Sequence, residues 1–454
     1  MASMRKTKLE ETAWVVDLEK AAAAAGDSPS SEAARYWHRH SIYRVPSCIK
    51  DLNRRAYHPQ VVSLGPFHHS HPNLLPMETH KRRSLLHFLR RHRRRHKSSP
   101  LAEFAAAVAA VADELEGAYQ GLAEEWPEEE VEERRERFLE MMVTDGCFLL
   151  EVMRTATGWE VNDYADDDPV FSSHGLLYTV PYIRRDMIMI ENQLPLLVLE
   201  KLVAVETGIQ ENEDFINKLV LRFLSPEAWP MATGVGLALH PLDILRRSLL
   251  FGPAPTPRVP PETSPPPDDI IRSAEELYEA GIRFRRSPTS SLHDIRFDAR
   301  RGVLHLPAIA VDDTTEYMLL NLMAFERLHT HAGGGNDVTA YVFFMDNMVD
   351  SARDVALLAA RRIVVNTVGS DKAVARMFNG LSRDVVLEPV SALDDVHREV
   401  NAYCRRRWHR WRANLVHTYF RSPWSFLSLA AAVFLLVMTV MQTVYTVLPF
   451  YKGG

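Results

Sequence analysis

The chain has 454 residues, of which 46% are apolar and 25% charged. These are the proportions of an ordinary globular protein, and they exclude a wholly disordered or collagen-like chain. Three cysteines are too few for a disulfide framework or a cysteine-built zinc site, and a formal net charge of −6 argues against a dedicated nucleic-acid binder.

The first 41 residues are polar and rich in alanine, and the stretch AAAAAGDSPSS is typical of a joint rather than a core element. We predict a variable arm over residues 1–41. It lacks an apolar core long enough for a signal peptide. Apolar residues at helical spacing, as in 101–126, predict a helical domain over residues 42–420.

Histidines gather in the segment SLGPFHHSHPNLLPMETHKRR. The side chains of His68, His69, His71 and His80 are candidate metal ligands, since imidazole with carboxylate suits zinc or iron. The prolines leave their geometry open. We favour a structural role, in which the histidines bond to loop carbonyls, and we predict no cofactor.

A basic run, RRHRRRHK, follows over residues 90–97. Such a run can contact nucleic acid or direct a protein to the nucleus. We favour the solvated end of a helix, because the chain as a whole is acidic.

The motif DGCFLLE places two acids, Asp145 and Glu151, on either side of an apolar run. An acid beside a buried run must be paired or hydrogen-bonded. Arg154 is the nearby candidate partner. We interpret both acids as bridges or caps between helices.

The motif RRDMIMIENQLP places Asp186, Glu191, Asn192 and Gln193 in an apolar segment that we predict to be a buried helix. Pro195 predicts a kink, because its ring clashes with the carbonyl four residues back. The polar side chains would then satisfy the freed backbone groups. In the alternative interpretation, Asp186 and Glu191 form an acid/base or metal pair.

Residues 252–269 are rich in proline and predict an extended, exposed loop. Beyond it, Ser273 and Glu276 have the spacing of a capping box, and Gly281 ends that short helix. Segments 295–298 and 303–306 predict a β-hairpin.

Two further capping patterns open helices, one from Asp313 with Glu316 and the other from Ser351 with Asp354. We therefore predict a mainly α fold with a small β-hairpin or sheet component, of the α+β class.

Residues 426–447 contain no charge and would form a helix of about 33 Å, enough for a membrane core of about 30 Å. We predict a transmembrane helix there, followed by a short tail over 448–454. Aromatic and basic residues before this segment and at its C-terminal end predict contacts at the membrane interface: Arg405, Arg406, Arg407, Trp408, Trp411, Trp424 and Tyr445. The positive charge before the span predicts a tail-anchored, single-pass protein with a cytosolic body and the lipid bilayer as a partner.

Several strings occur in one order along the chain: IYRVP, SLGPFHH, METHKRR, DGCFLLE, IENQLP, LHLPAIAVDDTTEYMLLNLMAFE and the tail from YF to VY. Together they resemble the plant domain-of-unknown-function 247 family. The resemblance implies a mostly helical plant protein with a C-terminal membrane helix and no known reaction. It adds Glu316, Asn321 and Glu326 to the structural motif residues. Some grass members are linked to self-incompatibility loci, which implies a role in reproductive recognition.

The sequence contains no phosphate-binding loop, nucleophile elbow or zinc-protease motif. We favour a non-enzymatic module that recognises an unidentified protein partner, in reproduction or signalling, and that does not bind nucleic acid. The alternative is a metal-assisted hydrolase built from the histidine segment and buried acids: His68, His69, His71, Asp145, Asp186 and Glu191. Convergence of these side chains in one open cleft would favour the enzyme.

Overall fold

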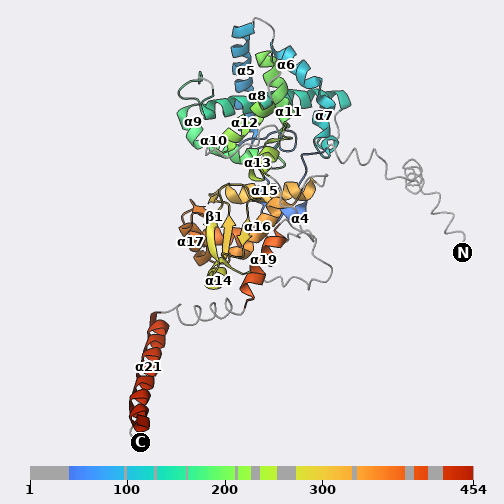
Figure 1. Cartoon of the computed structure of the whole chain (residues 1–454). Coiled ribbons are helices and arrows are strands. Elements are labelled where there is room, and N and C mark those ends of the chain that lie inside the picture. The colour runs from blue at the N-terminus through green and yellow to red at the C-terminus, as the bar shows by residue number, and fades with distance from the viewer. Residues whose placement is uncertain are drawn as a thin grey trace, which may run out of the picture. The chain divides into compact units, whose positions relative to one another are not determined.

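The computed structural model describes ten stretches of the chain: residues 40–96, 100–126, 130–159, 162–209, 213–225, 236–252, 272–329, 335–383, 393–406 and 423–452 (Figure 1). Nearly all of the predicted arm and of the proline-rich loop lies outside them. The chain divides into two compact units. The first comprises Met1–Ala228, Thr233–Leu245 and Ala324–Gly335, and the second comprises Trp229–Ala232, Arg246–Met323 and Asn336–Gly454.

The described part of the first unit is helical. Its α-helices are α4 (Ser47–Lys50), α5 (Leu75–His96), α6 (Pro100–Ala109), α7 (Ala112–Gly117), α8 (Val131–Thr157), α9 (Ser173–Tyr178), α10 (Val180–Met187), α11 (Leu196–Thr207) and α12 (Glu213–Leu224). Two short 3₁₀ helices, η1 (Arg54–Ala56) and η2 (Leu122–Glu124), and the start of α13 (Pro241–Leu249) complete it.

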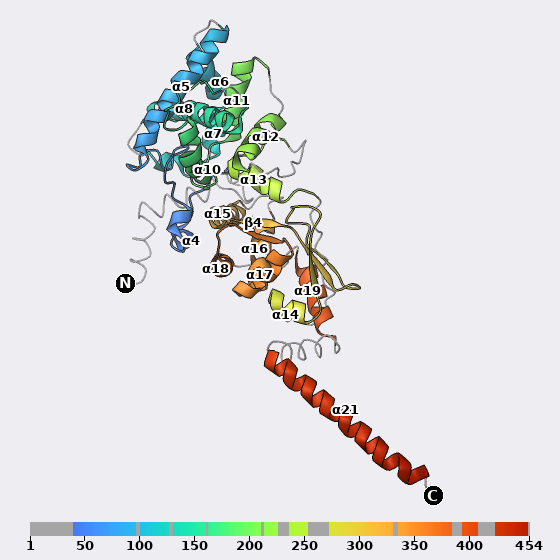
Figure 2. The same ribbon diagram turned by 90° about the vertical axis from the view of Figure 1, so that its left-hand side faces the viewer.

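Helix α8 is the centre of the first unit. From Met141 to Arg154 nearly every residue is buried, whichever side of the helix it occupies, so other elements must surround this half of α8. Helices α5, α6, α11 and α12 pack on it (Figures 1 and 2). Gly146 lets α11 approach closely, since a Cβ there would lie 2.5 Å from a methyl carbon of Leu202.

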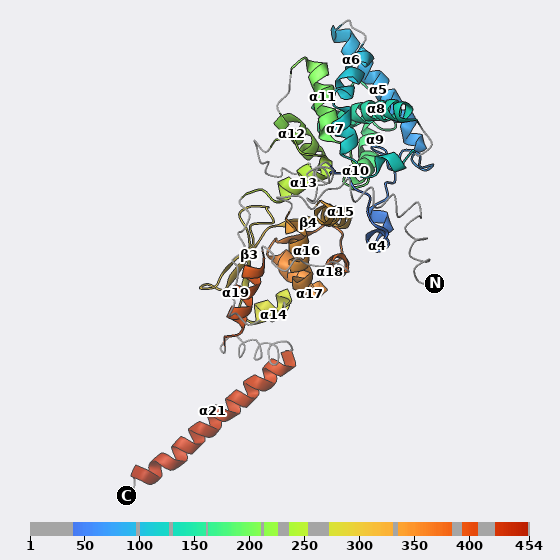
Figure 3. The same cartoon turned by 90° about the vertical axis from the view of Figure 1, so that its right-hand side faces the viewer.

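The second unit combines helices with short strands. Its helices are α14 (Ala274–Glu279), most of α15 (Thr315–Leu328), α16 (Asp337–Met348), α17 (Ala352–Ala360), α18 (Asp371–Leu381), α19 (Asp394–Cys404) and α21 (Pro423–Lys452). Its strands are β1 (Arg283–Arg286), β2 (Arg296–Asp298), β3 (Val303–Leu306), β4 (Ile309–Val311) and β5 (Val364–Asn366). Figure 3 shows β3 and α19 from the side.

The predicted hairpin is confirmed, because β2 and β3 pair antiparallel. Strand β1 adds in parallel to the other edge of β3, which gives the order β1-β3-β2, and a separate pair joins β4 to β5 in parallel. Phe284, Leu304 and Phe297 occupy one row across the larger sheet, and all three are buried. Phe297 packs edge-on against Tyr403 of α19. This face of the sheet therefore covers the core of the second unit.

Two of the three predicted caps are confirmed. The Ser273 side chain accepts a hydrogen bond from the Glu276 amide at the start of α14, and Ser351 and Asp354 form a full capping box on α17. At α15, however, Asp312 replaces the predicted Asp313. Its carboxylate accepts bonds from the Thr314 amide and the Thr315 hydroxyl. The helix begins at Thr315, which places Asp312 in reach of these donors.

The mainly α fold with small sheets is confirmed, but the predicted transmembrane helix is not. Residues 426–447 do lie within one helix, α21. Among the residues that the structure describes, however, no helix is both long and apolar enough to cross a membrane. A span needs about 20 consecutive, mainly apolar residues, whereas α21 carries Thr439, Gln442 and Thr443 close together. The prediction of a transmembrane helix is therefore wrong, and so is the single-pass membrane location with a cytosolic body that depended on it.

Candidate functional site

Five motif residues form a buried polar group in the first unit, which we call the inner network: Asp145, Asp186, Glu191, Asn192 and Gln193. Each is exposed by at most 1%. Asp145 lies on α8 and Asp186 in the last turn of α10, while the other three belong to the link between α10 and α11. Buried polar side chains require partners, and these five side chains hold segments that are remote in sequence.

The link between α10 and α11 is not the kinked helix that we predicted. Helix α10 ends at Met187, and Pro195 caps the N-terminus of α11, which starts at Leu196. Proline is suited to this position because it has no N–H that would need a helical partner. The side-chain nitrogen of Gln193 donates to the Met187 and Met189 carbonyls, both at 2.7 Å. These bonds fix the turn in place of helical hydrogen bonds.

Asn192 joins the link to residues 62–64, at the start of the SLGPFHH string. Its side-chain oxygen accepts a bond from the Leu64 amide at 2.7 Å, and its nitrogen donates to the carbonyls of Val62 and Asp186, each at 3.0 Å. Gln193 reaches a third segment, because its oxygen accepts a bond from the Leu242 amide at 2.9 Å. The side-chain amides of Asn192 and Gln193 thus direct both their nitrogen and their oxygen to backbone groups.

Asp186 binds three consecutive backbone amides. Those of Gln60, Val61 and Val62 donate to its carboxylate at 2.6–3.1 Å. Burial raises the pKa of the Asp186 carboxyl, and the three amide bonds oppose that rise without cancelling it. The carboxylate therefore fixes the backbone of this segment.

Glu191 fixes the chain before α5. It accepts a bond from the Val45 amide at 2.7 Å and forms an ion pair with Lys50, also at 2.7 Å, while Nε2 of His68 lies 3.4 Å away. Burial raises the pKa of Glu191, but the contacts with His68 and Lys50 outweigh it, so the pKa is lowered overall. Glu191 is therefore held as a carboxylate.

Asp145 pairs with Lys81, a lysine with no exposed surface. The two charged atoms lie 2.8 Å apart, and Lys81 also contacts Glu78 at 2.6 Å. The second Asp145 oxygen accepts a bond from the Gly65 amide at 2.8 Å. Gly65 has a φ of +71°, and a Cβ there would lie 2.7 Å from the Tyr119 hydroxyl, so only glycine fits this contact.

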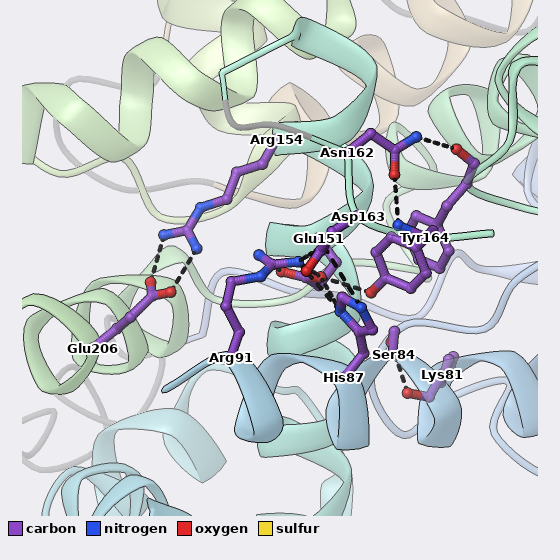
Figure 4. Close-up of polar contacts among 11 residues, drawn as sticks. Lys81, Ser84, His87, Arg91, Glu151, Arg154, Asn162, Asp163, Tyr164 and Glu206 are labelled. Atoms are coloured by element: carbon purple, nitrogen blue, oxygen red, sulfur yellow. Dashed lines mark hydrogen bonds and ion pairs between the residues drawn. The ribbon is translucent and has the colours of Figure 1, made fainter. Parts of the chain in front are cut away.

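Glu151 belongs to a separate cluster between α5 and α8 (Figure 4). Arg91 donates to both carboxylate oxygens at 2.9 Å, and the Tyr164 hydroxyl adds a bond of 2.6 Å. Burial raises the pKa of Glu151, but the contacts with His87, Arg91 and Tyr164 outweigh it and lower the pKa. The cluster thus keeps Glu151 ionised.

Arg154, which we expected to pair with Asp145 or Glu151, binds a different acid. It pairs with both oxygens of Glu206 at 3.0 and 2.6 Å, which joins α8 to α11 (Figure 4). Arg91 lies in the run that we interpreted as a solvated helix end. It does lie in the last part of α5, but its guanidinium is directed at Glu151, from 60 residues away in sequence.

The four candidate histidine ligands have different surroundings. His68 lies near Glu191 and packs its ring 5.2 Å from that of His58, whose ring also meets His71 at 4.5 Å. His69 lies 3.9 Å from Glu78. The fourth, His80, is close to Arg83, at 3.2 Å. Within the described stretches, no group of three or more histidine, cysteine or acidic side chains could hold a metal ion.

The remaining predicted residues that the structure describes belong to other elements than the inner network. Asn321 is buried on α15 and donates to the Tyr317 carbonyl at 2.8 Å, and Glu316 and Glu326 lie on the same helix. Arg405 and Arg406 are exposed directly after α19, and Tyr445 is exposed on α21. Trp424 is the second residue of that helix, while Arg407, Trp408 and Trp411 lie outside the described residues.

The arrangement holds segments that are remote in sequence against one another. Asp145, Asp186 and Glu191 have different partners, but each accepts at least one hydrogen bond from a backbone amide. Sequence reasoning missed Lys81 and Tyr164. Lys81 was part of the METHKRR string, and its position at helical spacing from the apolar Met77 and Phe88 is the one signal of its burial.

Comparison with known proteins gives a consistent set of similarities. The model of DUF247, described as "Plant protein of unknown function", matches residues 42–438. The UPF0481 protein At3g47200 of Arabidopsis thaliana is 30% identical over 436 residues, which cover 90% of this chain and 86% of the relative. The putative UPF0481 protein At3g02645 of the same plant is 24% identical over 542 residues, covering 97% and 96%. No solved structure matches the chain.

Proposed function

We propose that this chain, which belongs to the DUF247 family of plant proteins of unknown function, is a non-enzymatic module that works by binding another protein. Some grass members of the family are linked to self-incompatibility loci, so reproductive recognition, or signalling, is the setting in which we expect this binding.

One exposed surface carries the proposal. Helices α9 and α10 follow one another with Thr179 between them, and they present what we call the α9–α10 surface: His174, Leu177, Tyr178 and Tyr182. Leu177 is 65% exposed, Tyr178 60% and Tyr182 48%. The rings of His174 and Tyr178 lie 4.6 Å apart, and the Arg185 guanidinium lies over Tyr182 at 5.3 Å.

Such a surface is typical of a protein interface. Tyrosine and arginine are enriched where proteins meet, because an aromatic ring buries a large area at a small cost in side-chain entropy. Below this surface, α10 is fixed by Asp186, which binds the backbone of residues 60–62. A rigid support reduces the free energy lost on binding. The buried motif residues then act as the scaffold of the binding surface.

The test compares two tyrosine variants of the full chain in plant tissue extract. A photo-reactive phenylalanine analogue replaces Tyr178 and should crosslink a partner, which mass spectrometry identifies. The purified partner should then bind the Tyr178→Ala/Tyr182→Ala variant about tenfold more weakly or worse, since aromatic interface residues often contribute about 2 kcal/mol. Tyr278→Ala, an exposed tyrosine on α14 of the second unit, is the matched control and should bind normally.

Equal binding by both variants would contradict the proposal. So would an enzymatic activity: the purified chain is assayed with zinc, manganese or magnesium against esters, phosphoesters, peptides and nucleic acids. Metal-dependent turnover that His69→Ala abolishes would favour the hydrolase instead.

A further inference from the structure

A row of basic side chains crosses the outer face of the three-stranded sheet. The register aligns Arg285 of β1 with His305 of β3, and His305 with Arg296 of β2. Residues aligned across neighbouring strands share a face of the sheet. The adjacent row, Phe284, Leu304 and Phe297, faces the core, so the basic row faces outward.

Further basic residues surround this row. Arg283 lies two residues before Arg285 on the same face, and Arg301 lies in the turn between β2 and β3. The Arg283 guanidinium donates to the Arg301 carbonyl at 3.3 Å, which keeps the two together. We call Arg283, Arg285, Arg296, Arg301 and His305 the arginine face.

Nearby acids do not balance this charge. Asp294 lies 3.7 Å from Arg296 but also accepts a bond from the Thr289 hydroxyl at 2.8 Å. Asp298 lies 3.8 Å from Arg301, and one of its oxygens accepts two amide bonds of the turn. Arg285 makes no ion pair with any residue that the structure describes. Burial lowers the pKa of His305, Arg296 and Arg285 lower it further, and Asp294 and Asp298 raise it without cancelling the fall.

Arg285 and Arg296 lie on the two outer strands of the sheet, one on either side of His305. We propose that the arginine face docks a carboxylate-rich segment of a partner protein. The guanidinium groups can bind carboxylates through paired hydrogen bonds, and two strand spacings of about 4.8 Å separate Arg285 from Arg296. The Nδ1 atom of His305, buried and without a hydrogen-bond partner among the described residues, lies between them.

Charge and composition favour a protein partner over a nucleic acid. The chain carries a net charge of −6, so its long-range field opposes a long polyanion, whereas a short acidic segment responds to the local charge. Proteins that bind single strands also offer aromatic rings for base stacking. Here the two aromatic residues of the sheet, Phe284 and Phe297, lie on the buried face. The inference rests on the proposed function, protein binding, and names the chemistry of a partner at a second surface.

The test measures fluorescence anisotropy of the full chain with a labelled peptide of alternating glutamate and serine. Arg285→Gln/Arg296→Gln should weaken binding about tenfold or more, and salt should weaken the wild type in parallel. The matched control, Arg353→Gln/Arg376→Gln, removes two exposed arginines from α17 and α18 of the same unit and should bind like the wild type. Melting curves confirm that each variant is folded.

Three outcomes would overturn the inference: no binding of the glutamate peptide, equal binding of a glutamine–serine peptide, or equal loss in the control variant. Tighter binding of a single-stranded oligonucleotide, lost in Arg285→Gln/Arg296→Gln, would assign the face to nucleic acid and also overturn it. The peptide assay does not involve Tyr178 or Tyr182. If the peptide does not bind, the crosslinking test of the α9–α10 surface remains valid. If crosslinking finds no partner, the peptide assay can still be interpreted.

Discussion

Lys81 is a buried cation whose charge is shared by two carboxylates. Asp145 lies on α8, and Glu78 precedes Lys81 by three residues on α5, so the ion pair joins two helices that pack against each other. Burial raises the pKa of Asp145, Lys81 lowers it, and the negative Glu78 raises it again. The ammonium group of Lys81 thus balances the buried carboxylate of Asp145 and also pairs with the partly exposed Glu78.

Replacing this lysine should strongly destabilise the protein. In Lys81→Met, Asp145 keeps its place but loses its cation, and an uncompensated buried charge costs about 3–5 kcal/mol. Urea denaturation should show this loss in the free energy of unfolding. The double variant Lys81→Met/Asp145→Asn should recover part of it, because the unpaired charge is gone. Lys201→Met, at a partly exposed lysine, is the control and should change stability by less than about 0.5 kcal/mol. Full stability of Lys81→Met would show that the pair is not formed.

Helix packing in the first unit depends on a close approach at Gly146. In Gly146→Ala the new methyl group would meet Leu202 and Val198 of α11, which must move apart, at a cost of about 1–3 kcal/mol. Thermal unfolding should show a lower melting temperature. Gly380→Ala on α18 is the matched control, since a Cβ there meets nothing within 4 Å. It should be neutral or slightly stabilising, because alanine favours helix over glycine. Equal effects in the two variants would refute the role of the close approach.

Elements whose signals are local could be predicted from the sequence. Caps such as Ser273 and Ser351 act within one helical turn, and the hairpin of β2 and β3 needs a four-residue turn, so a short window contains the information. Strand β1 reads RFRR and joins β3 from 20 residues away, without an apolar alternation of its own. Its pairing is decided by tertiary contacts, which a local pattern does not reveal.

The same limit applies to the candidate site. Burial and pairing of Asp145, Asp186 and Glu191 follow from acids placed in apolar runs, but the partners do not. Arg154 is three residues from Glu151 and was the expected partner, whereas the actual partner Arg91 is 60 residues away. The Pro195 turn was missed for a related reason: the Gln193 side chain replaces helical bonds there, and a hydrophobic pattern does not record such a bond.

At the scale of the whole molecule, buried acids with opposite pKa shifts set the response to acid. Contacts with cations hold the pKa of Glu151 and of Glu191 below the ordinary range. Their stabilisation is complete above the unfolded pKa of about 4.3 and is lost as pH falls through the folded value. Asp145 and Asp186 have raised pKa values, so the folded state binds their protons first and gains relative stability as pH falls.

Two variants should therefore change the acid response in opposite directions. Glu151→Gln removes a group with a lowered pKa and should make the loss of unfolding free energy between about pH 5 and pH 3 shallower. Asp186→Asn removes a group with a raised pKa and should make the same loss steeper. Urea denaturation at a series of pH values measures both slopes. Parallel curves for the two variants and the wild type would contradict the assigned shifts.

The inner network also determines how late the N-terminal segment finds its hydrogen-bond partners during synthesis of the chain. The Val45 amide bonds to Glu191, which is 146 residues further along, and His240 contacts the Ser41 carbonyl across 199 residues. Ribosomes add about 5–20 residues per second, so Val45 waits about 7–30 s before its partner is synthesised. Ile42 can pair earlier, because its backbone bonds to Ala118 and Gln120, so the N-terminal segment gains its partners in stages. Until the last partner is made, the N-terminal segment exposes the apolar side chains of Ile42, Tyr43 and Val45, which the finished protein buries almost completely.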